Sequence, residues 1–473
     1  SLNNLNNLTV NGATADLSGV AVGTATLSSL EANVNVSGDF KLGDAASKVI
    51  TAKGDIDFNI ENVAALTLGN ITSSTGNASV IISSATGDVT LGAVSAEKGN
   101  VTLNAGNTLG AFEVGAITGD IVSVDLGGVL GEINSTATNK VSITSNEVVY
   151  VGSEISKNVV EITAAAGGTD LNAQMIGGAN SSDSLKLIGV GNTQSITASG
   201  DLSGGALTFD LTASTQLNSI DISGLKGITG DVGIELGKAV QGNKTDVSVQ
   251  GSDANEKITY ISEANLTEVK ISGDLGAGEN SIVITTTGAG ATLTTIDLSG
   301  LSATGGTLAS TITLNAANTA ANISIKGSLG GDNITVVSAN KAVAIDLGRD
   351  TAVDTVNVSA AKIADISNDS KIAEDLVSIT NALSGDKIKL VNATSIHDNG
   401  DLSSQATLKD AIGQLGSTPG TVADAVAEVF TYEGNTYVLD AAGVTFAQND
   451  VLVELVGTVT FSGIDAANTI TVA

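Results

Sequence analysis

Acidic residues in glycine-rich turns are the side chains of this sequence best suited to chemistry. Examples are the turns SDANE, GAGEN and GGDN, each of which lies between two β-branched stretches. A calcium ion takes six to eight hard oxygen ligands, which the carbonyls of a glycine turn and an acidic side chain can supply together. The turns therefore indicate Ca²⁺ as cofactor, with the metal-ligand candidates Asp183, Asp253, Glu256, Glu279, Asp332, Asp350 and Asp354.

One turn comes close to a known calcium motif. GGDNITV (Gly330–Val336) is a degenerate form of the nonapeptide Gly-Gly-x-Gly-x-Asp-x-apolar-x, whose successive coils hold Ca²⁺. No turn keeps the whole nonapeptide, and no two follow at nine-residue spacing. The alternative interpretation is that Asp, Glu and Asn fit the turns and keep the surface soluble. A net charge of −30 favours binding of some calcium.

Residues for catalysis are scarce, so we expect no enzymatic activity. His397 is the only histidine, which excludes a zinc site with several histidines within the chain. It lies in the polar stretch SIHDNGD, where a solvated loop is expected. Arg349 is the only arginine, too few for the carbanion chemistry of β-helix lyases. Paired carboxylates are common, but the aromatic platforms that hold sugars are rare.

Composition narrows the possible partners. The chain has 50 acidic and 20 basic residues, so nucleic-acid binding is not expected, because phosphates need clustered Lys and Arg. Cysteine is absent, which excludes disulfides and thiolate sites. No apolar run reaches the ~18–20 residues of a transmembrane segment. The sequence starts at Ser1 without Met or a signal region, so we expect a processed N-terminus and a further domain before it.

The elements that must position these turns are short strands. The sequence is 42% hydrophobic but only 2% aromatic, with 56 glycines, and Val, Ile and Leu alternate with Thr, Ser, Asn and Asp. This pattern predicts an all-β fold of many short strands joined by tight turns. We favour a β-solenoid, or β-helix-like repeat array, because the strands lack bulky aromatics. Tandem small β-sandwiches are the alternative.

A duplication supports the repeat interpretation. Ile220–Gly224 returns as Ile296–Gly300, and Val247–Tyr260 returns as Ile323–Val336, both displaced by 76 residues. Val269–Asp274 returns as Ile345–Asp350 in the same register, and a weaker copy places Gly200-Asp201-Leu202 before Gly273-Asp274-Leu275. Self-similarity at a fixed period is the mark of stacked repeats. We therefore predict an irregular β-repeat region at 1–158 and a duplicated β-repeat region at 159–360.

The remaining residues, 361–473, are expected to form a small C-terminal α+β module for secretion and assembly. Apolar residues fall at helical spacing in two runs. Ile372, Leu376, Ile379 and Leu383 make the first run; Leu408, Ile412 and Leu415 make the second. Five of the eleven aromatic residues occur in the last 44 positions, which predicts a better-filled core there.

The end of this module resembles a known family. Ala427–Gly463 combines an aromatic-x-aromatic strand (Phe430, Tyr432), Gly434 to Tyr437, then Asp440, Phe446 and the strand DVLVELVG (Asp450–Gly457). This order is similar to the C-terminus of S-layer proteins of Gram-negative bacteria that are exported by type I secretion, and of related repeats-in-toxin surface proteins. The preceding 360 residues are similar to that family in composition only.

The resemblance implies an extracellular protein of the cell surface that folds with calcium and assembles with itself into a two-dimensional S-layer lattice. Anchoring to outer-membrane lipopolysaccharide would belong to a missing N-terminal domain. We therefore expect a structural, self-assembling S-layer subunit. A type I-secreted repetitive adhesin is the alternative; it would show little self-assembly and would carry exposed aromatics on a distal domain. A polysaccharide-active β-helix enzyme ranks third.

Overall fold

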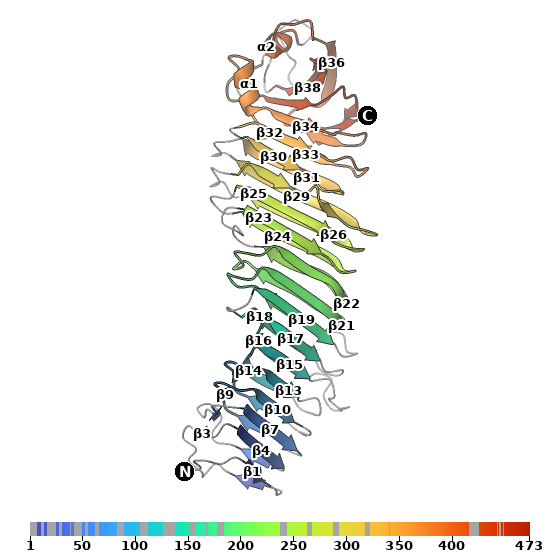
Figure 1. Cartoon of the computed structure of the whole chain (residues 1–473). Coiled ribbons are helices and arrows are strands. Elements are labelled where there is room, and N and C mark those ends of the chain that lie inside the picture. Colours follow the sequence, from blue (N-terminus) through green and yellow to red (C-terminus); the bar gives the residue numbers. More distant parts are fainter. Residues whose placement is uncertain are drawn as a thin grey trace. The chain divides into compact units, whose positions relative to one another are not determined.

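The structure is a computed structural model of the chain (Figure 1). It describes residues 7–10, 14–16, 25–27, 31–37, 39–41, 50–52, 55–61, 66–82, 89–104, 112–125, 138–151, 157–165, 169–176, 184–236, 244–262, 267–286, 293–316, 322–339, 341–415, 425–441, 443, 446–447 and 449–473. The chain divides into two compact units, Ser1–Glu235 with Ser252–Ala254, and Leu236–Gly251 with Asn255–Ala473.

The first unit is a stack of parallel strands. Its strands are β1 (Asn7–Val10), β2 (Thr14–Asp16), β3 (Ala25–Leu27), β4 (Glu31–Ser37), β5 (Asp39–Lys41), β6 (Ile50–Ala52), β7 (Asp55–Glu61), β8 (Leu66–Leu68), β9 (Ile71–Ser73), β10 (Ala78–Ile82), β11 (Val89–Leu91), β12 (Val94–Ala96), β13 (Val101–Asn104), β14 (Phe112–Thr118), β15 (Ile121–Asp125), β16 (Thr138–Thr144), β17 (Glu147–Val151), β18 (Lys157–Thr163), β19 (Asp170–Ile176), β20 (Ser184–Ile188), β21 (Ser195–Leu211) and β22 (Ser219–Leu236).

The coils of the first unit change their cross-section along the stack. Each early coil has three strands, so that β1, β4, β7 and β10 pair in one sheet, and β2, β5, β8 and β11 in a second. The third sheet runs through β3, β6, β9 and β12. From β14 to β20 each coil has two, because β14 pairs with both β11 and β12 and so continues two sheets at once. The long strand β21 then pairs with both β19 and β20 and so continues both sheets as one strand.

The coils of the second unit have two main strands each. One sheet is formed by β23 (Lys244–Gln250), β25 (Glu268–Asp274), β27 (Thr295–Asp297), β30 (Ile323–Lys326), β32 (Val343–Asp346) and β34 (Val377–Thr380). The other is formed by β24 (Asn255–Ser262), β26 (Glu279–Thr286), β29 (Thr307–Ala316), β31 (Gly331–Ala339), β33 (Thr355–Asn357) and β35 (Lys387–Lys389). A short strand, β28 (Leu301–Ser302), pairs with β25.

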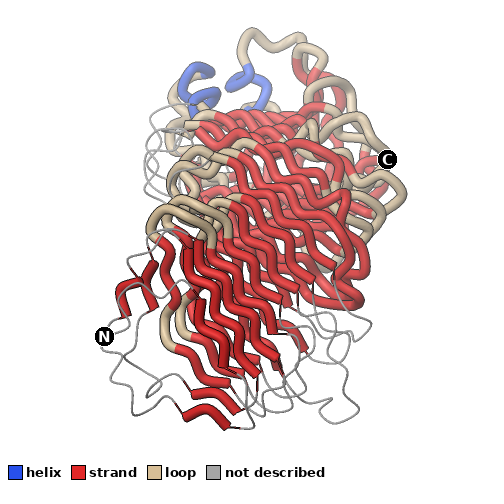
Figure 2. Tube along the Cα trace, turned by 60° about the horizontal axis from the view of Figure 1, so that its bottom comes forward, coloured by secondary structure: helices blue, strands red, loops and turns tan. Residues whose placement is uncertain are grey.

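This parallel pairing of each coil with the next makes the chain a β-solenoid. The stacked strands are drawn red in Figure 2. The solenoid prediction is confirmed, and the alternative of tandem sandwiches is wrong, because sandwich sheets are antiparallel. In the described coils the strands are hydrogen-bonded to the coils on either side, and the interior is filled mainly by aliphatic side chains with a few buried aromatics such as Tyr150, Phe209 and Tyr260.

Columns of buried side chains, aliphatic except for Tyr260, fill the interior between the two sheets of the second unit. One column is buried in register behind β24 and its successors, at Tyr260, Ile284, Ile312, Ile334, Val356, Ile388 and Ile470. The other lies behind β25 and its successors, at Val269, Ile296, Ile325, Ile345, Ile379 and Leu455. Each such side chain contributes about 1.5–3 kcal/mol by burial, so the columns supply most of the stability of the stack.

The duplication noted in the sequence corresponds to a displacement of three coils. Val247–Tyr260 contains the corner between β23 and β24, and Ile323–Val336 contains the corner between β30 and β31. These corners are joined by the successive pairings β23–β25–β27–β30. The weaker copy has a structural reason as well. Gly200 and Gly273 both have positive φ, 107° and 119°, and an added Cβ would lie 1.7 and 2.0 Å from the carbonyl oxygens of Met175 and Val249.

A C-terminal module follows the last coil of the second unit. It consists of α1 (Asp369–Asp375), α2 (Leu408–Ile412), β36 (Ser395–Asp401), β37 (Val426–Tyr432), β38 (Asn435–Asp440), β39 (Val451–Leu455), β40 (Phe461–Ile464) and β41 (Thr469–Val472). β39 adds to β34, and β41 adds antiparallel to β35, so both sheets of the last coil are extended by the module. The module thus covers the strand edges that the last coil would otherwise leave open.

The two predicted helical runs have different outcomes. The second is confirmed in part by α2, whose cap Thr407 accepts a hydrogen bond from the backbone N–H of Asp410 at 3.0 Å. The first is right only up to Leu376, where the backbone becomes extended. Ile379 lies instead in β34, because pairing with β32 buries it in the solenoid column and outweighs its helical spacing.

The aromatic residues of the C-terminus form the core of this module. Phe430 and Tyr437 stack with ring centroids 5.3 Å apart on paired strands β37 and β38, within a buried cluster that includes residues of both helices. Glu433 and Gly434, with φ of 48° and 81°, form the two-residue turn between these strands. Positive φ at both positions matches the right-handed twist of a tight hairpin. The motif behind the family resemblance is therefore a hairpin packed against the helices.

Candidate functional site

A ladder of buried polar side chains lies at one corner of the second unit, within β29 and β31 and just before β33 and β35. It consists of Ser310, Asp332, Asp354 and Asp386 on four successive coils, in register, and we call it the polar ladder. All four residues are at most 3% exposed. Buried carboxylates are expensive unless they are hydrogen-bonded, so the contacts of these oxygens decide what the ladder can do.

Two of the aspartates, Asp354 and Asp386, bind the backbone of the preceding coil. Oδ1 of Asp354 accepts from the backbone N–H of Asp332 at 2.8 Å, and Oδ1 of Asp386 accepts from that of Asp354 at 2.9 Å. Asp332 accepts from the hydroxyl of Ser310, and from the backbone N–H (3.0 Å) and the hydroxyl (2.9 Å) of Ser328. The ladder therefore stabilises the corner by hydrogen bonds from coil to coil.

The electrostatics of the ladder favour protons on its aspartates. Burial raises the pKa of Asp354 to about 8, and the negative charges of Asp332, Asp386 and Asp350 add to the rise. Burial also raises the pKa of Asp332, despite the hydrogen bonds from Ser310 and Ser328. A fourth carboxylate close by, that of Asp350, has an Oδ2 buried without a hydrogen-bond partner. Near neutral pH the corner therefore holds a proton or needs a cation.

The arrangement does not match a closed calcium site. Among the described residues, no group of three or more acidic or histidine side chains is placed to hold a metal ion. The physical reason is the ladder itself, since its carboxylates are one coil apart and turn toward backbone N–H groups rather than toward a common centre. Of the candidates that the structure describes, Asp332, Asp350 and Asp354 lie close enough to interact electrostatically.

The other candidates lie elsewhere. Glu256 is buried, and its backbone N–H donates to Oδ1 of Asn280 on the next coil. Asp253 and Glu279 are exposed, and Asp183 lies outside the described residues.

Sequence reasoning missed Asp386 and Ser310. A signal for Asp386 existed, because DNIT, DTVN and DKIK each place Asp before a polar-apolar-polar strand, at 332, 354 and 386.

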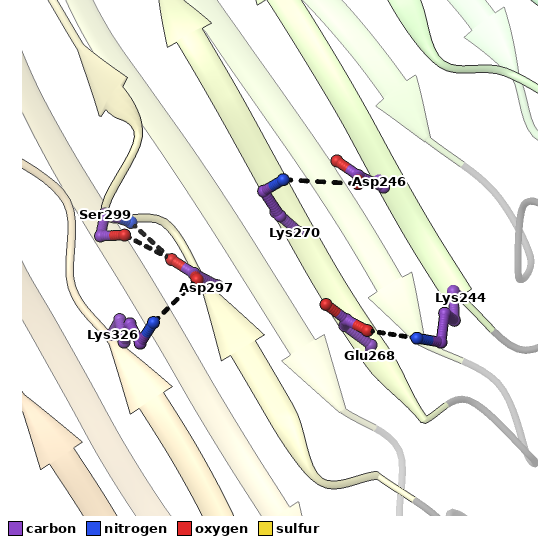
Figure 3. Close-up of polar contacts among 7 residues, drawn as sticks. All are labelled: Lys244, Asp246, Glu268, Lys270, Asp297, Ser299 and Lys326. Carbon is purple, nitrogen blue, oxygen red and sulfur yellow. Dashed lines mark hydrogen bonds and ion pairs between the residues drawn. The ribbon is translucent and has the colours of Figure 1, made fainter.

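The two sheets of the second unit differ sharply in the side chains that face outward. We call the sheet from β23 to β34 the charged sheet. Asp246, Lys270, Asp297, Lys326 and Asp346 form a column of alternating charge on five successive coils. Figure 3 shows two ion pairs of this column, Lys270–Asp246 at 3.4 Å and Lys326–Asp297 at 3.2 Å. It also shows the pair Lys244–Glu268 of the next column, at 2.8 Å. Each exposed pair contributes at most about 1 kcal/mol.

We call the sheet from β24 to β35 the neutral sheet. Its exposed side chains are mainly Thr, Ser, Asn, Val and Ile, as in the in-register column Thr259, Val283, Thr311, Asn333 and Thr355. The exposed charged residues within its strands are Lys257, Glu279, Lys387 and Lys389. Ile261, Val283 and Val337 are 54%, 38% and 41% exposed on this sheet. Val353, Leu329 and Leu383, also exposed, lie at the corners before its strands.

His397 departs from the solvated loop residue that the sequence predicted. It lies on β36, and its Nδ1 is 2.6 Å from Oε2 of Glu428, which is buried on the paired strand β37. Asn399 donates to the same oxygen at 2.8 Å. The histidine ring is half exposed and covers a buried carboxylate, so its role in the described structure is to satisfy Glu428.

Comparison with models of protein families and with curated proteins finds no match for this chain. The two helices that the structure describes, of 7 and 5 residues, are too short to span a membrane. The fold and the site define the chain as a β-solenoid repeat protein. It carries a polar ladder, a charged sheet and a C-terminal module on the last coil.

Proposed function

We propose that the chain is a structural subunit that assembles with itself into a two-dimensional lattice at the cell surface, as the resemblance of its C-terminus implies. The observation that carries the proposal is the use of its polar side chains. Those that could do chemistry bind along the coil stack, as Ser310 does to Asp332 and Lys270 to Asp246. Such side chains build a scaffold, and a scaffold functions through its outer faces.

The C-terminal module supports lateral assembly over end-to-end assembly. β39 and β41 pair with β34 and β35 and cover the strand edges of the last coil. An open solenoid edge would add further strands and produce fibres. Since this end is covered, copies of the chain meet through the sides of their coils, which suits growth in two dimensions.

We further propose that calcium promotes assembly from outside the solenoid. The chain carries −30 charges, which repel a second copy. Exposed carboxylates such as Asp253 and Glu279 can share a cation with a neighbouring copy without forming a closed site in one chain. Location outside the cell, and anchoring to lipopolysaccharide through a further domain, belong to the same proposal.

The test is electron microscopy of the purified chain in calcium, in EDTA, and in EDTA followed by excess calcium. We expect ordered sheets in calcium, loss of the sheets in EDTA and their return on adding calcium back. Sheets that persist in EDTA would contradict the calcium part alone. A chain that stays monomeric under all three conditions would contradict the lattice and favour the adhesin alternative.

A further inference from the structure

We propose that the neutral sheet of the second unit is the surface through which one copy of this chain binds another. The inference rests on the proposed function and assigns the contact to the outward side chains of β24, β26, β29, β31, β33 and β35. The partner is a second copy, which presents the same sheet.

Charge comes first. The chain has a net charge of −30, yet the neutral sheet exposes three lysines and one glutamate, Lys257, Lys387, Lys389 and Glu279. The charged sheet carries three lysines and five acidic residues at outward positions of its strands: Lys244, Asp246 and Lys326 are exposed, and Lys270, Glu268, Asp274, Asp297 and Asp346 are half-buried. Two acidic molecules approach each other with least repulsion through faces that carry little charge.

Exposed apolar side chains gather on the same face. Ile261 is 54% exposed, Val283 38% and Val337 41%, each at an outward position of a neutral-sheet strand. Among the described residues, no large hydrophobic side chain that is this exposed lies within the strands of the charged sheet. Apolar patches of this kind, bordered by polar residues, mark surfaces that bind another protein.

The area of the face suits a contact that is weak alone and strong in an array. Four of the six strands have 8 to 10 residues, and β33 and β35 have 3 each. With a rise of about 3.3 Å per residue and a strand spacing of about 4.8 Å, the face covers about 650 Å². Two such faces together bury about 1,300 Å², close to the lower limit of a specific interface. Since every copy in a lattice makes several contacts, interfaces of this size are sufficient.

Side-chain chemistry fits a pairing of like with like. Two neighbouring columns of outward side chains run along this face. One contains Thr259, Val283 and Thr311, and the other contains Ile261, Thr285 and Thr313. A hydroxyl can donate and accept, so Thr facing Thr is satisfied in either direction, and the methyl groups of Thr, Val and Ile pack against their equivalents. A face of strongly charged residues could not meet its own copy in this way.

The test places negative charge on one sheet at a time. The double variant Val283→Glu, Thr335→Glu puts two carboxylates on the neutral sheet. The matched control Ser248→Glu, Ser324→Glu makes the same change at outward positions of the charged sheet. Assembly of the full chain is followed by sedimentation velocity and electron microscopy, and circular dichroism checks that both variants are folded.

We expect the neutral-sheet variant to raise the concentration at which assembly begins by about 100-fold, because like charges then face each other across the contact. The control should change it less than about threefold. A milder variant, Ile261→Thr with Val283→Thr, should raise it about tenfold without adding charge, which covers the case that the glutamates disturb folding.

Three outcomes would overturn the inference, and they differ in what they say of the proposed function. Equal loss of assembly in the neutral-sheet variant and the control would place the contact elsewhere while the lattice stands. Assembly unchanged in all variants would do the same. A wild-type chain that never assembles would contradict both the lattice and this surface.

Discussion

The charged sheet and the neutral sheet of the second unit share one interior and differ in their exteriors. Both are parallel, both are backed by buried aliphatic columns, and both are built from alternating apolar and polar residues. Outside, one carries the alternating column from Asp246 to Asp346, and the other carries Thr, Asn and Val. The interior therefore specifies the solenoid, while the exteriors are free to serve different purposes.

The charged column has a role within the fold, which is to fix the register of the coils. Asp246, Lys270 and Asp297 meet in one register only, so a coil that slipped by one or two residues would lose its ion pairs. On the neutral sheet the outward residues are so alike that they specify register weakly. The charged sheet thus aligns the coils, and the neutral sheet is left for contact with another molecule.

The largest expected effect comes from the shared interior. Ile334→Ala behind the neutral sheet and Ile325→Ala behind the charged sheet should each lower the free energy of unfolding by about 2–5 kcal/mol. Both residues are fully buried, so equal costs would show that the sheets have equivalent interiors. The control is Val337→Ala, outward on the same strand as Ile334, with an expected change within about 0.5 kcal/mol. Chemical denaturation followed by circular dichroism measures all three.

The next effect concerns the polar ladder at one corner of the second unit. The pKa of Asp354 is about 8 in the folded chain, above its unfolded value of about 3.9, so the folded state binds more protons between these values. Stability should therefore fall as pH rises from about 4 to 8, by up to about 1.4 kcal/mol per pH unit, and then level off.

Asp354→Asn keeps a side-chain oxygen for the backbone N–H of Asp332 and removes the titration. We expect the variant to lose most of this pH dependence and to be more stable than the wild type at pH 8. Melting temperatures of both proteins at pH 5, 6.5 and 8 measure it. If their difference stayed constant across this range, the carboxylate would not be the titrating group.

A smaller effect is expected from the charged column. Lys270→Glu would place three acidic residues in a row with Asp246 and Asp297, and should lower the free energy of unfolding by about 1–2 kcal/mol at low salt. High salt should restore much of the loss. Thr311→Glu, with the neutral neighbours Val283 and Asn333, is the matched change on the other sheet and should cost less than about 0.5 kcal/mol in dilute, unassembled protein. Equal costs on both sheets would remove the distinction between them.

Local patterns in the sequence predicted much of this fold, and long-range register could not be predicted from them. The alternation of apolar and polar residues gave the strands, and the 76-residue period gave stacked coils. Coil length varies, however: the paired residues are 24 apart for Val247 and Ile271 but 34 apart for Val343 and Val377. The sequence therefore does not show which side chains stack on one another, and neither the polar ladder nor the difference between the two sheets could be predicted from it.

The site residues show the same limit. Asp332, Asp350 and Asp354 were three of the seven calcium-ligand candidates chosen by residue type, and the sequence does not show that Oδ1 of Asp354 accepts from the backbone N–H of Asp332 one coil away. Glu256 was placed with them by type, although its own contact is with Asn280. His397 looked like a loop residue because SIHDNGD is polar, and only the pairing of β36 with β37 shows its contact with Glu428.

The most direct test of the account uses the absence of cysteine from the chain. Thr311→Cys places one thiol near the middle of the neutral sheet, and Ser324→Cys places one on the charged sheet. In a symmetric contact, residues near the centre face their own copies closely enough for a disulfide. Under mild oxidation in calcium we predict covalent dimers from Thr311→Cys and few from Ser324→Cys. Dimers from Ser324→Cys alone, or equally from both, would contradict assembly through the neutral sheet.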